Sequence, residues 1–186
     1  MVVMLIVVVV LVVLALMLAG TYNRLVGLRQ RANQAFADID VQLQQRHDLI
    51  PNLVETVKGY AAHEQGTLEA VTNARAAAAG ATTVEGKVQA ENALTGALRQ
   101  LFAVAEAYPD LKANANFLRL QDELADIENK LAAARRFFNS AVAEFNAAIQ
   151  QFPAVLIAGP FGFGERTFFD VGADRAAVAA APQVKF

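Results

Sequence analysis

Residues 46–55, RHDLIPNLVE, carry the densest set of side chains that could do chemistry in this chain. The stretch holds one of the two histidines, together with an arginine, two acids and a proline, in alanine-rich surroundings. Histidines and carboxylates are common general acids and bases, so an active site is one interpretation of this stretch. The competing interpretation is a junction between two helices.

A helix junction accounts for most of these residues. Asp and Pro are both favoured at the start of a helix, so we expect Asp48 to cap a second helix, with Pro51 in its first turn and Glu55 one turn further on. Arg46 and His47 complete the predicted junction. Arg46 stands where the apolar pattern predicts a core residue, so it either pairs with a carboxylate such as Glu55 or faces another subunit.

The two histidines do not predict a metal site. A zincin motif needs a second histidine one helical turn after the first, and Thr67 stands at that position relative to His63. The Glu-x-x-His pairs of di-iron bundles are missing as well. If the chain reversed at Pro51, His47 and His63 would be offset along the helices by about 12 Å. Zinc ligands lie about 2 Å from one ion, so this pair cannot share one within one chain.

Other catalytic patterns are equally weak. The glycine-rich segment 159–164, GPFGFG, has the wrong order for a dinucleotide fingerprint and follows no predicted strand. Ser140 is the only serine and lies within a predicted helix, and the chain contains no cysteine. The acidic residues of the last long helix are interpreted as a solvated face: Glu123, Asp126 and Glu128, with Arg119 and Lys130 as neighbours. We therefore expect no catalytic, cofactor-binding or metal-binding residues, no cofactor and no enzymatic activity.

The N-terminus predicts a membrane anchor over residues 1–21. No polar side chain occurs from Val2 to Ala19, and such a helix covers about 27 Å of the roughly 30 Å hydrocarbon core. Tyr22 follows at the depth where aromatic residues favour the headgroups. A cleaved signal sequence is the alternative, but it normally begins with basic residues, and none precedes this run.

Charge distribution predicts the orientation and the partners. The basic residues nearest the anchor, Arg24, Arg29 and Arg31, all follow it, so the positive-inside rule places the short N-terminus outside and the body in the cytoplasm. We therefore expect a single-pass membrane protein, with the lipid bilayer as a partner. The net charge is −2 and acidic and basic residues are mixed along the chain, so no nucleic-acid partner is expected.

Residues 22–152 read as four amphipathic helices, because apolar residues recur every three or four positions. The first runs from Leu25 and is continuous with the anchor, and the second ends at Gly80. The third begins at Val84 and closes near Tyr108-Pro109, and the fourth spans 117–152. Four charged residues fall on these apolar stripes: Arg46, Glu64, Arg75 and Glu91. The predicted fold is all-α, with the transmembrane helix continuing into an antiparallel long-helix bundle of the four-helix type.

The C-terminal segment, 153–186, combines aromatic residues with glycine and proline. Phe161, Phe163, Phe168 and Phe169 make it too apolar for a free tail and too broken for a helix. It is expected either to lie across its own bundle or to contact another subunit or lipid. From residue 173 onwards little can be buried, so we expect mobility there.

Residues 22–75, and above all the block IDVQLQQRHDLIPNLVETVKGYAAHE, resemble the signature half of the LemA family of bacterial membrane proteins. FPAVLIAGPFGF, the following FF and the terminal PQVKF are similar to that family's C-terminal segment, with Val155 and Pro160 as small departures. The resemblance implies one N-terminal transmembrane helix, an antiparallel bundle and an outward-facing N-terminus. It implies no established enzymatic activity.

Two functional hypotheses follow. The first is a non-enzymatic scaffold anchored in the membrane, which forms homo-oligomers or organises partner proteins there. The alternative is a membrane sensor or regulatory adaptor that signals to a cytoplasmic partner. The sequence does not identify a partner protein for either.

Overall fold

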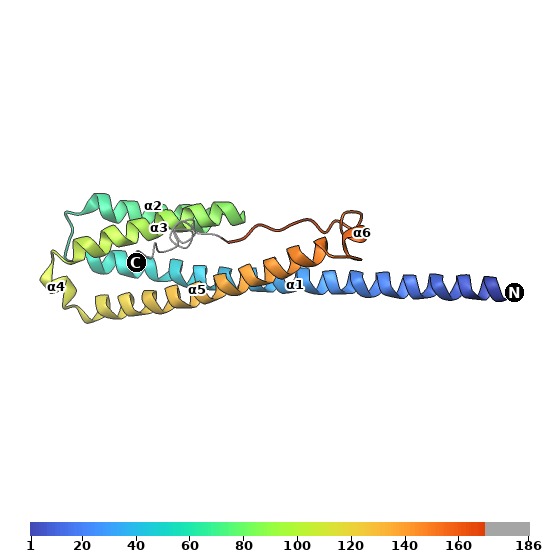
Figure 1. Cartoon of the computed structure of the whole chain (residues 1–186). Coiled ribbons are helices and arrows are strands. Elements are labelled where there is room, and N and C mark those ends of the chain that lie inside the picture. The colour runs from blue at the N-terminus through green and yellow to red at the C-terminus, as the bar shows by residue number, and fades with distance from the viewer. Residues whose placement is uncertain (170–186) are drawn as a thin grey trace, which may run out of the picture. The chain divides into compact units, whose positions relative to one another are not determined.

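The computed structural model describes residues 1–169, and every regular element in that range is a helix (Figure 1). The elements are α1 (Val2–Lys58), α2 (Gln65–Gly80), α3 (Val84–Ala105), α4 (Pro109–Lys112), α5 (Ala115–Gln150) and α6 (Val155–Ala158). The prediction of an all-α chain, whose apolar N-terminal helix continues into a helical bundle, is confirmed. The predicted mobility after residue 173 lies outside the described residues.

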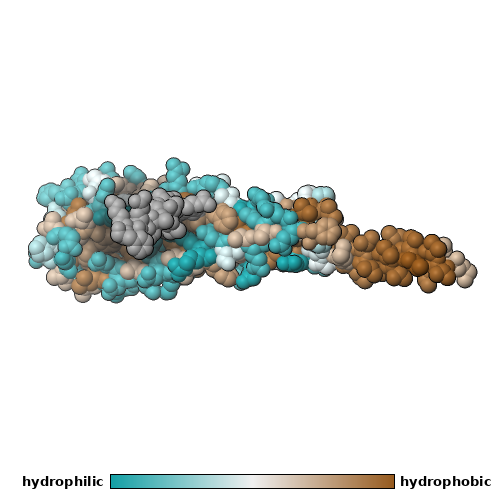
Figure 2. All heavy atoms as spheres, in the orientation of Figure 1, coloured by the Kyte–Doolittle hydropathy of each residue, from teal (hydrophilic) through white to brown (hydrophobic). Residues whose placement is uncertain are grey.

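α1 is one continuous helix of 57 residues that begins in the apolar N-terminal stretch. Side chains 1–20 are all exposed, and they form the brown end of the surface in Figure 2. Among the described residues, α1 is the one helix long and apolar enough to cross a membrane. An exposed apolar surface of this size usually marks a contact with lipid or protein. The length of the apolar stretch matches the thickness of a bilayer.

The predicted helix junction at Pro51 is wrong. α1 passes through Pro51 and ends at Lys58, and the chain turns over residues 59–64 before α2 begins. Proline lacks the N–H that would bond to the carbonyl of residue i−4, which is His47. Arg75 of α2 supplies a replacement donor, because its Nε lies 2.7 Å from that carbonyl oxygen. The freed carbonyl is thus satisfied from a neighbouring helix, and α1 continues.

Contacts divide the described chain into two compact units. Unit 1 contains Met1–Ile39 and Ala134–Phe168, and unit 2 contains Asp40–Ala133 together with Phe169. α1 and α5 each contribute residues to both units. The predicted division along the chain into an anchor (1–21), a bundle (22–152) and a C-terminal segment (153–186) stays a prediction.

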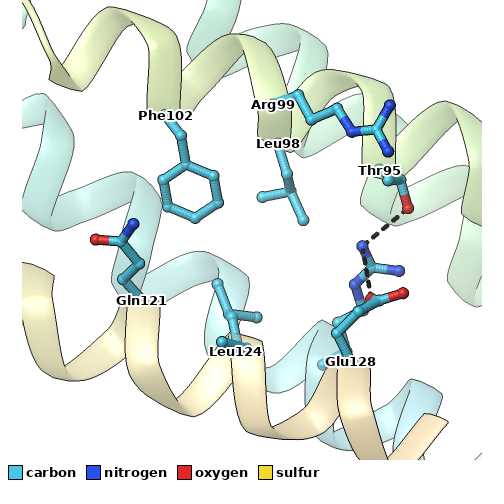
Figure 3. Close-up of a pocket in the computed structure, with 9 residues that line it drawn as sticks. Thr95, Leu98, Arg99, Phe102, Gln121, Leu124 and Glu128 are labelled. Carbon is cyan, nitrogen blue, oxygen red and sulfur yellow. Dashed lines mark hydrogen bonds and ion pairs between the residues drawn. The ribbon is translucent and has the colours of Figure 1, made fainter. Parts of the chain in front are cut away.

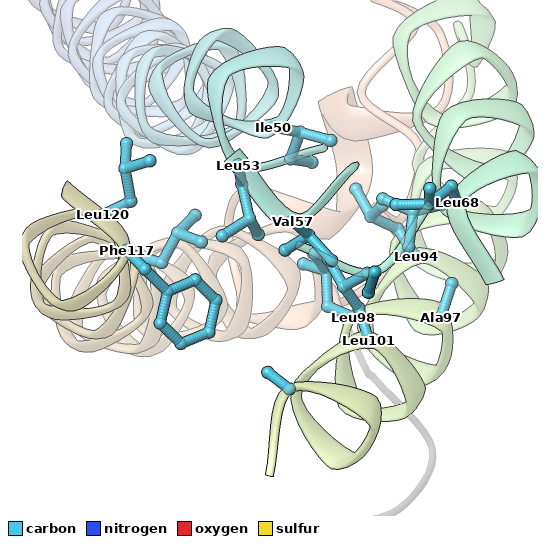
Figure 4. Close-up of a cluster of buried hydrophobic side chains, with 14 of the residues drawn as sticks. Ile50, Leu53, Val57, Leu68, Leu94, Ala97, Leu98, Leu101, Phe117 and Leu120 are labelled. Carbon is cyan, nitrogen blue, oxygen red and sulfur yellow. The ribbon is translucent and has the colours of Figure 1, made fainter. Parts of the chain in front are cut away.

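Unit 2 is built around α2 and α3, which pack against each other. Residues 81–83 join them, and Thr83 caps α3 by accepting the N–H of Gly86 at 3.0 Å. The C-terminal part of α1 and the first part of α5 complete the core. Figure 4 shows its buried side chains, which include Ile50, Leu53, Val57, Leu68, Leu94, Leu101, Phe117 and Leu120.

The short helix α4 connects α3 to α5 and was not expected from the sequence. Pro109 occupies its first turn, and Leu111 is fully buried. Asn114 then caps α5 by accepting the N–H of Phe117 at 3.0 Å. Four residues are too few to produce a recognisable helical period, which is why the pattern of apolar residues does not reveal α4.

Unit 1 has a separate core, formed by α1, the C-terminal part of α5 and the turn that contains α6. Its buried residues are Leu25, Phe145, Ala148, Ile149, Ala154, Ile157, Ala158 and Phe163. The rings of Phe36 and Phe138 lie 5.4 Å apart between α1 and α5. The sequence predicted that the C-terminal segment is too broken for a helix. The structure differs, because Val155–Ala158 form one short helical turn that packs in this core.

Candidate functional site

A cluster of buried charged residues lies in unit 2. Arg46, His47 and Glu91 are 5%, 4% and 1% exposed. Arg46 donates from Nη1 to Glu91 Oε2 at 3.0 Å, and His47 Nε2 lies 2.7 Å from Glu91 Oε1. Arg46 also donates from Nη2 to the hydroxyl of Thr95 at 2.9 Å and lies 3.6 Å from a carboxylate oxygen of Glu128. We call these five residues the charge cluster.

Helical spacing explains how the charge cluster forms. Arg46 follows Leu43 by three residues and precedes Ile50 by four, so it points into the core with both. Glu91 stands three residues before the buried Leu94 on α3, and Thr95 lies one turn after it. The two opposite charges therefore sit on the inward faces of α1 and α3.

The contacts of the charge cluster are those of a structural ion pair. Burying a charge costs several kcal/mol, which is offset only by a well-placed partner and further hydrogen bonds. Both oxygens of Glu91 have protein partners, Arg46 on one and His47 on the other. The expectation that Arg46 pairs with a carboxylate is confirmed, but its partners are Glu91 and Glu128 rather than Glu55.

The other residues of the predicted junction lie outside the cluster. Asp48 is exposed and accepts a hydrogen bond from Gln44 at 2.8 Å. Glu55 is exposed and lies 3.7 Å from Lys58. The residues that sequence reasoning did not assign to this site are Glu91, Thr95, Arg75 and Glu128. Glu91 and Arg75 carried a signal, because both are charged residues at core positions of their helices, whereas Thr95 and Glu128 carried none.

A pocket of about 330 Å³ opens beside the charge cluster between α1, α3 and α5. Figure 3 shows Phe102, Leu98 and Leu124 on its apolar side. Arg99 and Glu128 lie at its charged end, where one dashed line marks the hydrogen bond from Arg46 to the hydroxyl of Thr95. Its size suits a small molecule, but it contains no arrangement of a nucleophile and a base.

The far end of unit 2 holds a second polar contact between helices. The hydroxyl of Tyr108 donates to Glu64 at 3.1 Å, joining the α1–α2 turn to the turn between α3 and α4. This hydrogen bond, followed by burial and by the negative charge of Glu64, raises the pKa of Tyr108 above its ordinary value. Nearby, Asn114 donates to the hydroxyl of Tyr60 at 2.9 Å.

Polar contacts at Arg166 hold the described part of the C-terminal segment within unit 1. The side chain of Asn146 donates to the carbonyl of Arg166 and accepts its N–H, both at 2.9 Å. The Arg166 guanidinium donates to Asn33 at 2.5 Å and to the carbonyl of Arg29 at 3.4 Å. Burial, and then the nearby charge of Arg29, lower the pKa of Arg166. The part of the segment around Arg166 therefore lies along α1 and α5 of its own chain.

The four phenylalanines proposed as subunit or lipid contacts separate into two groups. Phe163 and Phe169 are buried, and Phe163 packs beneath the guanidinium of Arg29, whose Cζ lies 5.0 Å from the ring centroid. These two are therefore unsuited to an external contact, which corrects the prediction for them. Phe161 and Phe168 are exposed. Phe161 also stacks edge-on against Tyr22, with ring centroids 5.2 Å apart.

The acidic face of α5 has the expected local pairs. Arg119 donates to Glu123 at 2.9 Å, and Lys130 lies 2.6 Å from Asp126. His63 is exposed in the α1–α2 turn. Over residues 1–169, no three His, Cys, Asp or Glu side chains gather in a way that could hold a metal ion.

Comparison with known proteins gives one family match. The model of the LemA family matches residues 35–186. This range contains the charge cluster, α2 to α6 and the whole C-terminal segment.

Curated relatives are more distant. Magnetosome protein MamQ of Magnetospirillum gryphiswaldense is 26% identical over 174 residues, which covers 80% of this chain and 64% of that protein. Magnetosome proteins MamQ 2 and MamQ 1 of Paramagnetospirillum magneticum are each 24% identical with the same coverage. The chain thus spans about 64% of the length of these relatives.

Proposed function

This chain belongs to the LemA family, and from that premise we propose that it is a non-enzymatic helical scaffold anchored in a bacterial membrane, where it self-associates or organises partner proteins. One observation carries the proposal. The uncovered apolar stretch of α1 continues, without a break, into the part of the same helix that packs in the cores of both units. An anchor and a folded body that share one helix suit a protein that holds other molecules at a bilayer.

The proposed lack of enzymatic activity is supported by the contacts of the charge cluster. Catalytic groups need access to substrate and a free lone pair or proton. Both Glu91 oxygens are engaged by protein side chains, and Glu91, Arg46 and His47 are all buried. These residues are therefore better suited to hold α1 against α3 than to react.

For the topology, we propose an N-terminus outside the bacterial cytoplasmic membrane and a body in the cytoplasm, as Arg24, Arg29 and Arg31 favour. The chain lacks cysteine. Ser140→Cys, at an exposed position of α5, and Val2→Cys, at the N-terminus, therefore each give a single labelling site. A maleimide that cannot cross the membrane should label Val2→Cys in intact cells and Ser140→Cys only after lysis. The reverse pattern would overturn this topology.

Self-association is tested by light scattering coupled to size exclusion, in mild detergent and in lipid nanodiscs. The scaffold proposal expects a protein mass of more than one chain. Phe168→Ser tests the exposed part of the C-terminal segment as the contact, with Leu118→Ser on exposed α5 as the matched control. A single-chain mass at every concentration would remove self-association from the proposal.

The second candidate is a membrane sensor or adaptor, favoured by the position of Arg46 and His47 on the same helix as the anchor. Movement of an unbroken helix reaches every residue on it, so the charge cluster would respond to a change in the membrane. Crosslinking in cells followed by purification separates the two candidates. A self-associating scaffold mainly recovers itself, whereas an adaptor recovers one defined cytoplasmic protein in a fixed ratio.

A further inference from the structure

We infer that the turn around α6 is a second membrane contact, which inserts apolar side chains into the bilayer interface beside the end of the α1 span. The contact surface consists of Phe152, Val155, Leu156 and Phe161, and we call it the α6 patch. Its occupant is the lipid bilayer. The inference rests on the membrane anchoring by α1 proposed above and concerns only residues of unit 1.

The position of the α6 patch relative to the span is fixed by direct packing. Leu18, Ala19 and Tyr22 of α1 surround a pocket of about 260 Å³ together with Ile157 and Phe161. Val2–Ala19 cover about 27 Å as a helix, close to the thickness of the hydrocarbon core. When this stretch spans a bilayer, the α6 turn lies at the boundary between hydrocarbon and headgroups.

The α6 patch is apolar and uncovered. Phe152, Val155, Leu156 and Phe161 are 75%, 50%, 63% and 59% exposed. No polar side chain occurs anywhere from residue 152 to residue 164. The opposite side of the same turn is already buried in the core of unit 1 through Ala154, Ile157 and Ala158, so the exposed side is not needed for that core. Figure 2 shows a brown area at this turn, next to the anchor.

The backbone of the turn suits an apolar environment. An unpaired N–H or C=O costs several kcal/mol in a bilayer core, so inserted segments satisfy their polar groups internally. From Val155 to Phe163, every residue except Gly159 and Pro160 donates its N–H to a carbonyl between Gln151 and Gly159. Pro160 has no N–H to satisfy. The turn therefore offers the bilayer few free donors.

Polar groups border the α6 patch where headgroups are expected. Arg24 is exposed, two residues past Tyr22, and is placed to contact the phosphate of an anionic lipid. Gln150 donates to Glu165 at 2.6 Å across the two ends of the segment. The sequence of side chains along the surface is thus apolar span, apolar patch and then polar residues, which follows the polarity of one leaflet.

A second copy of the chain is the competing occupant. The patch directly adjoins the span, so lipid that surrounds the span also contacts the patch without a conformational change of the protein. Continuity with the membrane-spanning surface therefore favours the bilayer.

Tryptophan fluorescence tests this inference with little background, because the chain contains no tryptophan. Leu156→Trp places the probe on the α6 patch, Leu11→Trp places one within the span, and Leu118→Trp places one on exposed α5 of unit 2. The full-length variants are reconstituted into vesicles of phosphatidylcholine and phosphatidylglycerol, without or with brominated lipids, which carry the bromine either near the headgroup end of the chains or near the bilayer centre, where Leu11→Trp is expected. Far-UV circular dichroism confirms folding, and Val155→Trp repeats the test at a neighbouring residue.

The inference expects blue-shifted emission of Leu156→Trp and a loss of intensity with brominated lipid, while Leu118→Trp keeps its intensity and is quenched by iodide. Emission of Leu156→Trp at the water-exposed wavelength would overturn the inference. Blue-shifted emission that brominated lipid does not quench would also overturn it, because protein would then cover the patch. If Leu11→Trp is not quenched either, the proposed anchoring fails as well. If Leu11→Trp alone is quenched, only the second contact fails.

Discussion

Arg75 donates from Nε to the carbonyl oxygen of His47 at 2.7 Å, and this carbonyl is the one that a proline four residues later leaves without its helical partner. The contact joins α2 to α1 at the only proline within α1. It explains why the helix continues where the sequence predicted a break.

Removing this donor should destabilise the protein. Arg75→Ala leaves the partly buried carbonyl of His47 unpaired, and the expected loss is about 1–3 kcal/mol of the free energy of unfolding. Pro51→Ala restores the missing N–H, so Arg75→Ala should cost less in that background. Chemical denaturation of the four proteins, followed by circular dichroism in one detergent, gives the coupling free energy. Equal costs in both backgrounds would show that the carbonyl contact is unimportant.

The buried ion pair gives a second prediction. Glu91→Gln leaves the Arg46 guanidinium buried with one carboxylate fewer, and we expect a loss of about 3–5 kcal/mol in unfolding free energy. Replacing both Arg46 and Glu91 by Met should cost less than the single change, because neither the buried guanidinium nor the buried carboxylate of that pair is then left without its partner. Glu123→Gln, which breaks an exposed pair with Arg119, is the control and should cost about 0.5 kcal/mol or less.

Tyr108 provides a prediction of pH dependence. Its pKa is raised in the folded state, so the folded protein holds the phenol proton more tightly than the unfolded chain does. This contribution to stability is fully present below the ordinary tyrosine pKa of about 10 and is lost as the pH rises through the folded value. The difference in phenolate absorbance between wild type and Tyr108→Phe isolates the titration. Glu64→Gln should move its midpoint downwards, and an unmoved midpoint would contradict the assigned cause.

The contact between Asn146 and Arg166 predicts protection of the C-terminal segment from trypsin. Asn146→Ala removes both hydrogen bonds to the backbone at Arg166, so cleavage after Arg166 should become faster. Asn52→Ala, at an exposed position of α1, is the matched control. Mass spectrometry of timed digests measures the rate at this one bond. If both variants are cut at the wild-type rate, Asn146 does not hold the segment.

Much of the fold follows from apolar spacing. Periods of three and four residues predicted the end of α2 at Gly80 and the start of α3 at Val84, and they placed α5 within two residues at each end. The end of α3 was expected near Tyr108-Pro109, but the helix ends at Ala105. The error at Pro51 has a physical cause, because the tolerance of a proline within a helix depends on a donor from elsewhere in the fold. Arg75 lies 28 positions after His47, whose carbonyl it binds, and no local sequence pattern predicts that contact.

The candidate site was predicted only in part. Arg46, Glu64, Arg75 and Glu91 all stand on apolar stripes, and each makes a polar contact with another segment of unit 2. A charged residue at a core position therefore indicates a buried partner. Which partner it has depends on how the helices align. That alignment cannot be read from one stripe alone, so Glu55, which is near Arg46 in the sequence, was the carboxylate suggested.

The two units also differ in when their contacts can form during synthesis. The helical segments of unit 2 come from the continuous stretch 40–133, so they are synthesised before residues 134–168 of unit 1. Unit 1 joins residues on both sides of that stretch, and its bond from Arg166 to the carbonyl of Arg29 spans 137 positions. The apolar stripe of α1 that begins at Leu25 therefore has no partner from α5 or α6 until residues 134–168 have been synthesised.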